Sequence, residues 1–503
     1  MRQKEFLLLS VAGPFMATLS LALLSAPAFA SSCSPELLQG MASKGLHILS
    51  AHRAKGRCEI DGTLLTSGQG AGQGEARFRA HFPDKWNAAF IMFGVGGFGG
   101  TLAPSANPAD LEKADREGYV TAITDTGHFS TLPIPAVDGS FATPHRGANA
   151  TPARVDYAWR ATHQIAVALK SMSVSYYRRP IRHAIFDGCS NGGRQGLLEA
   201  ARFSKDFDGI IAGAPFFTLR LMLGDLKVQQ ASLRTPGAQL DARDLSTADS
   251  FALHECSPSG HPAKEPLDTR SCHPHWARLI CKSGDAVKGN TVACLSPAKI
   301  GTLQAFFEDT NDAQGAVVYP GFLPGYLSVT HALELQFADP QGTKPVSSQG
   351  WSLHHGPIEY QFDEQVFRFF IPTDPGRPFL SPAWSNQGIV TRNSLAAYDA
   401  ATGDASLDDP AVLRKYLTSG GHLLLYHGLG DPAISPKSTM ALYQAIGASD
   451  RMRLFLIPGM GHCGGGAGPR SLDILSSLED WITSGRAPQA LTGPDNLSIA
   501  ASP

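Results

Sequence analysis

The sequence predicts an α/β fold with a doubly wound, mostly parallel sheet and a large inserted subdomain. Short apolar runs typical of buried parallel strands alternate with stretches whose apolar residues recur at helical spacing. One of these runs leads directly into Gly188–Gly192, a Gly-x-Ser-x-Gly sequence, and a helix-like segment follows. Between about residues 220 and 395 the alternation fades and four of the eight cysteines occur, which predicts the insertion.

Length and composition narrow the class of protein. With 503 residues the chain can bury a large core, and 52 glycines and 35 prolines indicate a loop-rich globular protein. Charged residues make up 17% of the chain, and the formal net charge is −2 without a long run of like charge. No nucleic-acid partner is expected, because proteins that bind nucleic acids carry a basic patch for the phosphates.

The first 30 residues have the features of a cleaved signal peptide. Arg2 and Lys4 give a positive start, residues 6–24 are apolar, and Ala28–Ala30 forms a small-x-small cleavage signal. We expect cleavage of residues 1–30 rather than their retention as a membrane anchor. No later stretch is long and apolar enough to span a bilayer. The mature protein is therefore expected to be secreted or periplasmic, without a membrane partner.

All eight cysteines follow the predicted cleavage site. An even number of cysteines in an exported chain favours disulfide bonds. Cys33 and Cys58 are expected to pair and to close a local loop. The chain has no Cys-x-x-Cys pair, so neither a zinc site nor a thioredoxin-like redox site is expected.

The predicted elements divide the mature chain into three parts. In residues 31–219, strands are expected at 76–82, 88–93, 119–124, 181–186 and within 206–215, with a helix at 156–177. Residues 220–395 are the inserted subdomain. In residues 396–503, strands are expected at 422–427 and 453–458, with helices at 411–418, 438–446 and 471–484.

A serine lies between two glycines at the predicted junction of strand and helix. Such a junction is the nucleophile elbow of the α/β-hydrolase fold. Gly188 and Gly192 flank Ser190 because the turn is sharp, and a side chain at either position would clash with the crossing backbone. Taken alone, the motif is equally compatible with an ordinary glycine-rich turn. The rest of the chain decides between the two interpretations.

Ser190, Asp431 and His462 occur in the order nucleophile, acid and base that α/β-hydrolases use, and each follows a predicted strand. Sites in open α/β sheets form beyond the carboxyl ends of the strands. We expect Ser190 to be the nucleophile, His462 to take its proton, and Asp431 to orient the His462 ring. Asp431 could otherwise be a simple turn former. The weaker alternatives, which lack the order or the position, are Asp404, Asp408, Asp409, His128, His422 and His427.

A glycine-rich loop, residues 94–100, follows the predicted strand at 88–93. Glycines let backbone N–H groups point into a cavity, and in α/β-hydrolases this loop supplies one donor of the oxyanion hole. The expected donors are the N–H of Asn191, which follows the nucleophile, and the N–H of Gly97 or Gly96. A phosphate-binding loop is not expected, because no Lys-Ser or Lys-Thr pair follows the glycines.

Two cysteines are neighbours of the predicted catalytic residues. Cys189 precedes Ser190, and Cys463 follows His462. If Ser190 and His462 are hydrogen-bonded, their sequence neighbours can fall within the roughly 4.4–6.8 Å Cα separation that a disulfide requires. We therefore expect a Cys189–Cys463 bond that ties the two loops together. The alternatives are a reactive free cysteine or a different pairing.

With these motifs the chain resembles the tannase and feruloyl esterase family of secreted serine esterases. The resemblance covers most of the mature chain and is strongest at residues 124–128, 188–196, 212–215, 426–431 and 458–463. Paired cysteines beside the serine and the histidine are a hallmark of that family, and its inserted part is a lid over the active site. The resemblance implies hydrolysis of aromatic acid esters, feruloyl or galloyl esters for example. Other aromatic esters, such as terephthalate monoesters, are the alternative.

One segment departs from the family pattern. Lids of the family usually hold calcium in an Asp-x-x-Asp-Gly loop after a cysteine that looks like Cys256. Here residues 257–265 lack that motif, and the nearby acids are Glu265 and Asp268. Calcium takes 6–8 oxygen ligands, including carboxylates, so we expect no metal or other cofactor. Two disulfides are expected to hold the lid instead, Cys256–Cys272 and Cys281–Cys294.

Two other functions use the same fold. One is a secreted binding protein that has lost catalysis, against which the complete triad argues; the other is a peptidase or amidase with the same triad. Several lid aromatics are candidates for stacking on a substrate ring, although most are expected to be lid core: Phe322, Tyr326, Trp351, Tyr360, Phe367 and Phe369. No sequence signal indicates the oligomeric state.

Overall fold

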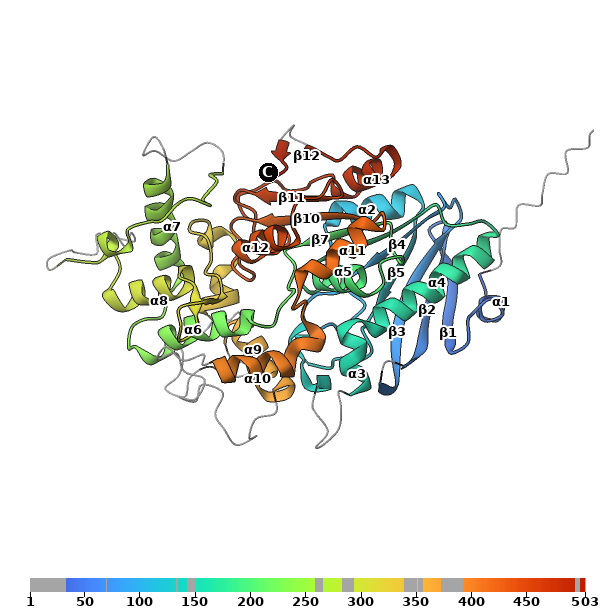
Figure 1. Ribbon diagram of the computed structural model, residues 1–503, viewed down its shortest axis with the longest axis horizontal. Coiled ribbons are helices and arrows are strands. Elements are labelled where there is room, and N and C mark those ends of the chain that lie inside the picture. Colours follow the sequence, from blue (N-terminus) through green and yellow to red (C-terminus); the bar gives the residue numbers. More distant parts are fainter. Residues whose placement is uncertain are drawn as a thin grey trace, which may run out of the picture. The chain divides into compact units, whose positions relative to one another are not determined.

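Nine strands form one sheet in the computed structural model of the protein, in the order β1-β2-β3-β5-β4-β6-β7-β10-β11 (Figure 1). These strands are β1 (Leu46–Ala54), β2 (Arg57–Gly68), β3 (Ala71–Pro83), β4 (Ala89–Phe93), β5 (Val120–Thr124), β6 (His183–Cys189), β7 (Gly209–Gly213), β10 (His422–Gly428) and β11 (Met452–Ile457). Two short hairpins pair β8 (Thr310–Asn311) with β9 (Val317–Tyr319) and β12 (Ala490–Thr492) with β13 (Ser498–Ala500).

The structure describes residues 33–68, 70–132, 134–142, 151–257, 266–282, 294–338, 351, 356–371, 392–493 and 498–502. The predicted signal peptide, residues 1–30, lies outside the described residues. So do residues 258–265, on which most of the argument against a lid calcium depends.

The sheet has a parallel and an antiparallel part. The strands β5, β4, β6, β7, β10 and β11 run parallel to their neighbours in this list. The strands β1, β2 and β3 form an antiparallel meander, and β3 pairs antiparallel with β5. The predicted α/β class is confirmed. Of the meander, the sequence pattern predicts β3 but neither β1 nor β2.

Helices cover both faces of the parallel strands. One face packs against α4 (Ala161–Tyr177), α5 (Asn191–Arg202), α11 (Leu413–Thr418) and α12 (Pro436–Ile446); the other packs against α2 (Pro108–Glu117) and α13 (Ile474–Ser484). Successive side chains of a strand point to opposite faces. In β4, Phe90 and Met92 therefore join the first hydrophobic cluster, whereas Ile91 joins the second.

The chain between β7 and β10 forms a helical insertion with a core of its own. Its helices are α6 (Leu221–Arg234), α7 (Ala242–Cys256), α8 (Pro297–Phe307), α9 (Ile358–Gln365) and α10 (Arg392–Thr402). Figure 1 shows α6, α7 and α8 grouped together, away from β1, β2 and β3. The hydrophobic cluster of the insertion also contains Phe98 and Tyr157 from the first part of the chain and Ile434 from the last. The insertion thus packs against the loops after β4 and β10 and against the helical turn that precedes α4.

The lid aromatics singled out from the sequence are mostly core residues. Those that are at most 6% exposed are Phe322, Tyr326, Trp351, Tyr360 and Phe367. The ring of Phe322 stacks on that of Phe306, with centroids 4.1 Å apart, and Phe369 is partly buried against the same cluster. This burial matches the expectation that most of them build the lid.

The eight cysteines form four disulfide bonds: Cys33–Cys58, Cys189–Cys463, Cys256–Cys272 and Cys281–Cys294. They are the pairings expected above. The first fixes the segment before the short helix α1 (Pro35–Gln39) to β2, and the last two lie within the insertion. The Cys189–Cys463 bond joins the end of β6 to the loop after β11.

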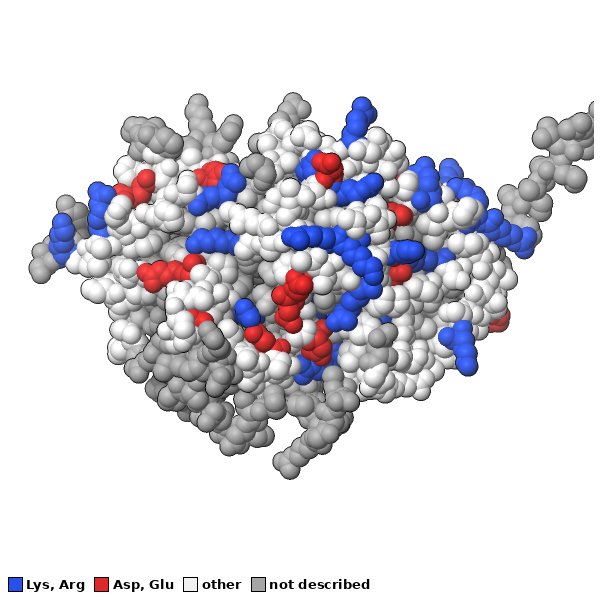
Figure 2. Space-filling view, in the orientation of Figure 1, with Lys and Arg blue, Asp and Glu red and all other residues white. Residues whose placement is uncertain are grey.

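The surface carries charges of both signs. On the face shown in Figure 2, Lys and Arg side chains are interspersed with Asp and Glu and separated by wide uncharged areas. None of the helices in the described part of the chain combines the length and the apolar character needed to cross a membrane.

Candidate active site

Ser190 lies between β6 and α5 in a sparsely populated backbone conformation. Its φ of 61° and ψ of −125° fit neither a helix nor a strand. A Cβ added at Gly188 would lie 2.5 Å from the carbonyl carbon of Gly192, so the turn tolerates no side chain there. The Ser190 side chain caps no backbone N–H of α5. The junction therefore has the tight geometry of a nucleophile elbow.

Asp431 and His462, in the loops after β10 and β11, face each other. Nδ1 of His462 lies 2.8 Å from Oδ2 of Asp431. The Asp431 side chain is fully buried, whereas that of His462 is 22% exposed. The second carboxylate oxygen, Oδ1, accepts hydrogen bonds from the backbone N–H groups of Ala433 at 2.8 Å and Ile434 at 3.0 Å. The turn after β10 therefore aims Oδ2 at the histidine ring.

The Asp431 carboxyl is held in its ionised form. Burial by itself would raise its pKa, but the charge of His462 and the hydrogen bonds with His427 and His462 outweigh burial and lower that pKa below its ordinary value. An ionised carboxylate only accepts hydrogen bonds, so Nδ1 of His462 carries the proton. Nε2 of His462 is then the ring atom that can accept a proton.

His427 contacts the same carboxylate. Its Nε2 lies 3.1 Å from Oδ2 of Asp431, and its side chain is fully buried. Order and position along the chain gave His427 no role, because those criteria select a base that faces the nucleophile. The structure places it behind the acid instead. The one sequence signal that could have indicated this is the spacing of four residues between His427 and Asp431 across a strand end.

The Cys189–Cys463 bond brings the serine loop and the histidine loop together, with the two cysteine Cα atoms 5.8 Å apart. In the described part of the chain, the hydrogen bond of His462 is the one to Asp431, and none joins its ring to Ser190. Such serine–histidine contacts are often long in free enzymes and shorten in the complex with substrate. The structure thus brings all three predicted residues to one end of the sheet.

The glycine-rich loop after β4 packs directly on the start of α5. A Cβ added at Gly94 would lie 2.5 Å from the Cα of Gly192. Val95 is held from both sides, because its N–H donates to Oε1 of Gln195 at 3.0 Å and its carbonyl accepts from Nδ2 of Asn191 at 2.9 Å. The side chains of α5 therefore fix this loop beside Ser190.

Two of the predicted oxyanion donors have no competing partner. The backbone N–H groups of Asn191 and Gly97 donate to no other residue that the structure describes, whereas that of Gly96 faces the Ala103 carbonyl across the bridge between Val95 and Pro104. Tyr157 and Arg194 hold the Asn191 side chain, whose Oδ1 accepts from the Tyr157 hydroxyl at 3.1 Å and from Nε of Arg194 at 2.7 Å. Sequence reasoning missed both supports. Arg194 lies within the glycine-rich motif, but no local pattern marks Tyr157, which is 34 residues away along the chain.

The alternative acids and histidines have other environments. Asp404 forms a salt bridge with Arg154, and the ring of His422 contacts Arg451. Asp408 and Asp409 are exposed, and the ring of His128 stacks on that of Phe141. None of these contacts leads to Ser190 among the described residues.

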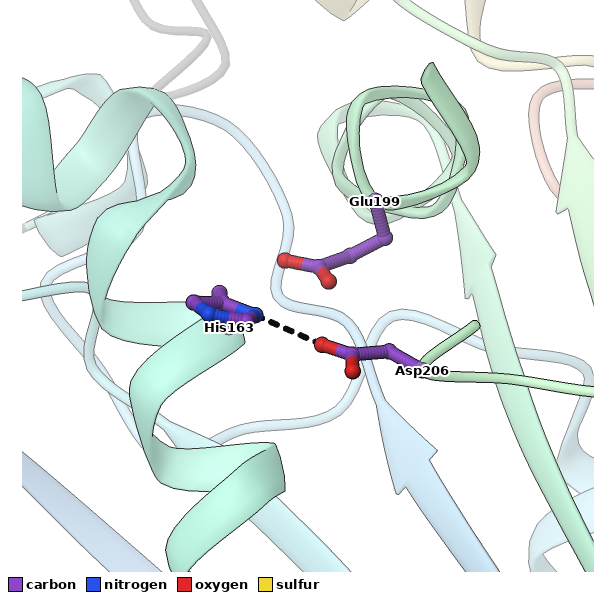
Figure 3. Close-up of side chains that lie close together, drawn as sticks. All are labelled: His163, Glu199 and Asp206. Carbon is purple, nitrogen blue, oxygen red and sulfur yellow. Dashed lines mark hydrogen bonds and ion pairs between the residues drawn. The ribbon is translucent and has the colours of Figure 1, made fainter. Parts of the chain in front are cut away.

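One cluster of potential metal ligands occurs among the described residues, near the C-terminal end of α5. His163, Glu199 and Asp206 offer ligand atoms within 4.8 Å of one another, and Figure 3 shows the three side chains converging. His163 already bonds to Asp206 at 2.6 Å, and the Lys170 ammonium lies 3.6 Å from the same carboxylate. Burial raises the pKa of Glu199 well above its ordinary value. The contacts of His163 and Lys170 with Asp206 account for that carboxylate by a hydrogen-bonded ion pair.

The fold places the protein in the α/β-hydrolase class. The comparison with protein families narrows this class further. The family model described as tannase and feruloyl esterase matches residues 58–497. The chain belongs to the tannase and feruloyl esterase family and is therefore a carboxylic ester hydrolase.

Two relatives illustrate the range of the family. The chain is 26% identical over 497 residues to mono(2-hydroxyethyl) terephthalate hydrolase of Piscinibacter sakaiensis, an alignment that covers 88% of this chain and 80% of that protein. It is 28% identical over 426 residues to a probable feruloyl esterase of Arthroderma benhamiae, with 81% and 73% covered.

Solved structures share the fold. Feruloyl esterase B from Aspergillus oryzae superposes with a TM-score of 0.73 at 20% identity, covering 92% of this chain and 94% of that one. Tannin acyl hydrolase from Aspergillus niger gives a TM-score of 0.65 at 17% identity, with 94% and 92% covered. The helical insertion is therefore part of an architecture that recurs over nearly the whole chain.

Proposed function

We propose that the protein hydrolyses esters of aromatic, phenolic acids through an acyl-enzyme on Ser190. The observation that carries this proposal is the 2.8 Å contact between Nδ1 of His462 and the buried Oδ2 of Asp431. A disulfide ties that histidine loop to the residue before Ser190. An imidazole paired in this way with a carboxylate can take the proton of a serine hydroxyl, which by itself is a weak nucleophile.

In the first half of the reaction, Oγ of Ser190 attacks the ester carbonyl carbon while Nε2 of His462 takes the hydroxyl proton. The tetrahedral intermediate collapses, the alcohol leaves with the proton from His462, and the acyl group stays on Ser190. In the second half, His462 takes a proton from water, which attacks the acyl carbon. The second tetrahedral intermediate then collapses, the bond to Oγ of Ser190 breaks, His462 returns the proton to Oγ, and the acid leaves. Asp431 stabilises the imidazolium in both halves.

The oxyanion of each tetrahedral intermediate is proposed to lie against the N–H groups of Asn191 and of Gly97 or Gly96. The contacts of Val95 with α5 hold the two donor segments together, so the donors are positioned before substrate binds. Each donor of this kind typically contributes about 2.7–4 kcal/mol to stabilising the transition state.

An aromatic acyl group is proposed because both relatives described above are named after esters of aromatic acids. The names feruloyl esterase and mono(2-hydroxyethyl) terephthalate hydrolase both refer to acids with an aromatic ring. The terephthalate monoester is the second candidate, since that relative aligns with 88% of the chain. Residues 1–30 and the four disulfides support secretion or transfer to the periplasm as the site of action.

A substrate panel tests the proposal. We expect turnover of methyl ferulate, methyl gallate or a tannin to exceed that of a terephthalate monoester and of a short p-nitrophenyl ester, and the matched amides to be inert. A fluorophosphonate probe should label the wild-type protein and not the Ser190→Ala variant. Equal labelling of both proteins would contradict the role of Ser190. Turnover of short aliphatic esters alone would contradict the aromatic substrate class.

A further inference from the structure

Both ring nitrogens of His427 have polar neighbours in the core. Nδ1 lies 2.7 Å from Oγ1 of Thr439 on α12. Nε2 lies 3.1 Å from Oδ2 of Asp431 and 3.0 Å from the carbonyl oxygen of Ile434. Because the side chain of His427 is 0% exposed, water does not compete for these contacts.

The neighbours determine which nitrogen carries the hydrogen. Both atoms beside Nε2 are acceptors, a carbonyl oxygen and a carboxylate oxygen, so Nε2 must be protonated and must donate. Nδ1 shares a hydrogen bond with the Thr439 hydroxyl, which can donate or accept. His427 thus directs a fixed donor at Asp431, and both of its nitrogens are already engaged.

The Asp431 carboxylate is consequently bound at both oxygens. Oδ1 accepts two backbone N–H groups, from Ala433 and Ile434. Oδ2 accepts hydrogen bonds from two imidazole nitrogens, Nε2 of His427 at 3.1 Å and Nδ1 of His462 at 2.8 Å. The backbone bonds fix the position of Oδ1, and His427 fixes the direction in which Oδ2 points toward His462.

We propose that His427 is a positioning residue for the esterase reaction, and that Thr439, His427 and Asp431 form one hydrogen-bonded chain that ends on Nδ1 of His462. This inference rests on the proposed function of Ser190, Asp431 and His462. His427 touches no reacting atom. It acts by holding the acid in the orientation that keeps the His462 ring facing the serine.

Among the described residues, the other titratable groups around Asp431 come from the lid, namely Glu359 and Tyr319. Burial raises the pKa of both groups and so favours their neutral forms.

The test compares His427→Leu with His427→Gln in the full-length enzyme. The leucine removes the donor to Asp431, whereas the glutamine amide reaches as far as Nε2 and restores an N–H. We expect His427→Leu to lower kcat roughly 10- to 100-fold, the cost of one lost hydrogen bond to a charged group, with KM nearly unchanged. His427→Gln should recover most of that loss. The acidic limb of the kcat/KM profile should move to higher pH in His427→Leu, because the less compensated carboxylate stabilises the imidazolium of His462.

His422 provides the matched control. It lies on the same strand, is 6% exposed, and contacts Arg451 at the end of β10 remote from Asp431. We expect His422→Leu to lower the Tm by about as much as His427→Leu does, and to leave kcat unchanged. The far-downfield proton resonance of the His462–Asp431 hydrogen bond should shift in His427→Leu and stay in place in His422→Leu.

The outcomes separate this inference from the proposed function. If the wild-type protein is not labelled by the fluorophosphonate and cleaves no ester, the proposed function fails. If wild type is active and His427→Leu keeps its kcat and pH profile, the positioning role of His427 fails alone. Equal losses of kcat in the leucine and glutamine variants would also overturn it, because they would indicate loss of packing and not of the donor.

Discussion

The buried side chain of Asp225 in the lid is expected to make the stability of the protein depend on pH. It lies on α6, where its Oδ1 accepts a hydrogen bond from Gln336, and Gln336 also donates to the carbonyl of Pro432, next to Asp431. Burial raises the pKa of Asp225 to about 8, although the Gln336 bond opposes this shift. The carboxyl is therefore protonated in the folded protein at neutral pH.

This raised pKa predicts a loss of stability as the pH rises. An unfolded Asp titrates near about 3.9, so between about pH 4 and pH 8 the unfolded state releases a proton that the folded state retains. Stability falls across this window. We expect the Tm of wild type to fall between pH 5 and pH 8 by more than that of Asp225→Asn. The excess should be on the order of 2–4 °C, measured by scanning calorimetry. Parallel curves for the two proteins would contradict this assignment.

The residues of the candidate site differ in how far the sequence predicts them. Ser190, Asp431 and His462 follow from order and from their place after strands, because the fold brings strand ends together. His427 and Tyr157 act through contacts across the fold. The partner of His427, Thr439, lies on a helix after the turn, so side-chain packing and not local pattern creates the pair.

Among the elements, the disulfide between the loops after β6 and β11 sets the geometry of the site. We expect Cys189→Ala combined with Cys463→Ala to lower kcat/KM roughly 10- to 100-fold, because small displacements of catalytic groups cost rate steeply. Fluorophosphonate labelling of Ser190 should also become slower but should not disappear. Adding a reductant to the wild-type enzyme should likewise lower its esterase activity.

The Cys33–Cys58 bond is the control for this prediction. It lies beside α1 and β2, so the variant Cys33→Ala with Cys58→Ala should lose stability and keep its kcat/KM. An equal loss of activity in both double variants would show that the effect is general destabilisation.

The parallel strands could be predicted because both of their faces are buried and they read as short apolar runs. β1 could not be predicted, because its burial does not alternate along the strand: one fully buried residue is followed by exposed and half-buried ones. The insertion was expected as an interruption of the pattern, but its helices were not. Helices such as α8 pack several of their sides in the lid core and so lack a clear polar face.

For the whole molecule, the feature to test is calcium binding by the lid, which the sequence of residues 257–265 does not favour. Asp268, one of the two acids near Cys256, is bound by Arg270 through its guanidinium. We therefore expect no tightly bound calcium. Elemental analysis of the purified protein and Tm values with and without EDTA should show no metal and no shift. One calcium per chain, or a Tm that falls in EDTA, would contradict this expectation.

The placement of Cys189 and Cys463 also bears on when the enzyme becomes active. The two residues are 274 positions apart, so the serine loop is synthesised long before its histidine partner. A chain that ends before residue 462 lacks both the base and the second half of the bond. The bond further requires an oxidising compartment. On the proposed function, full esterase activity is thus expected only after the chain has been completed and the bond has formed.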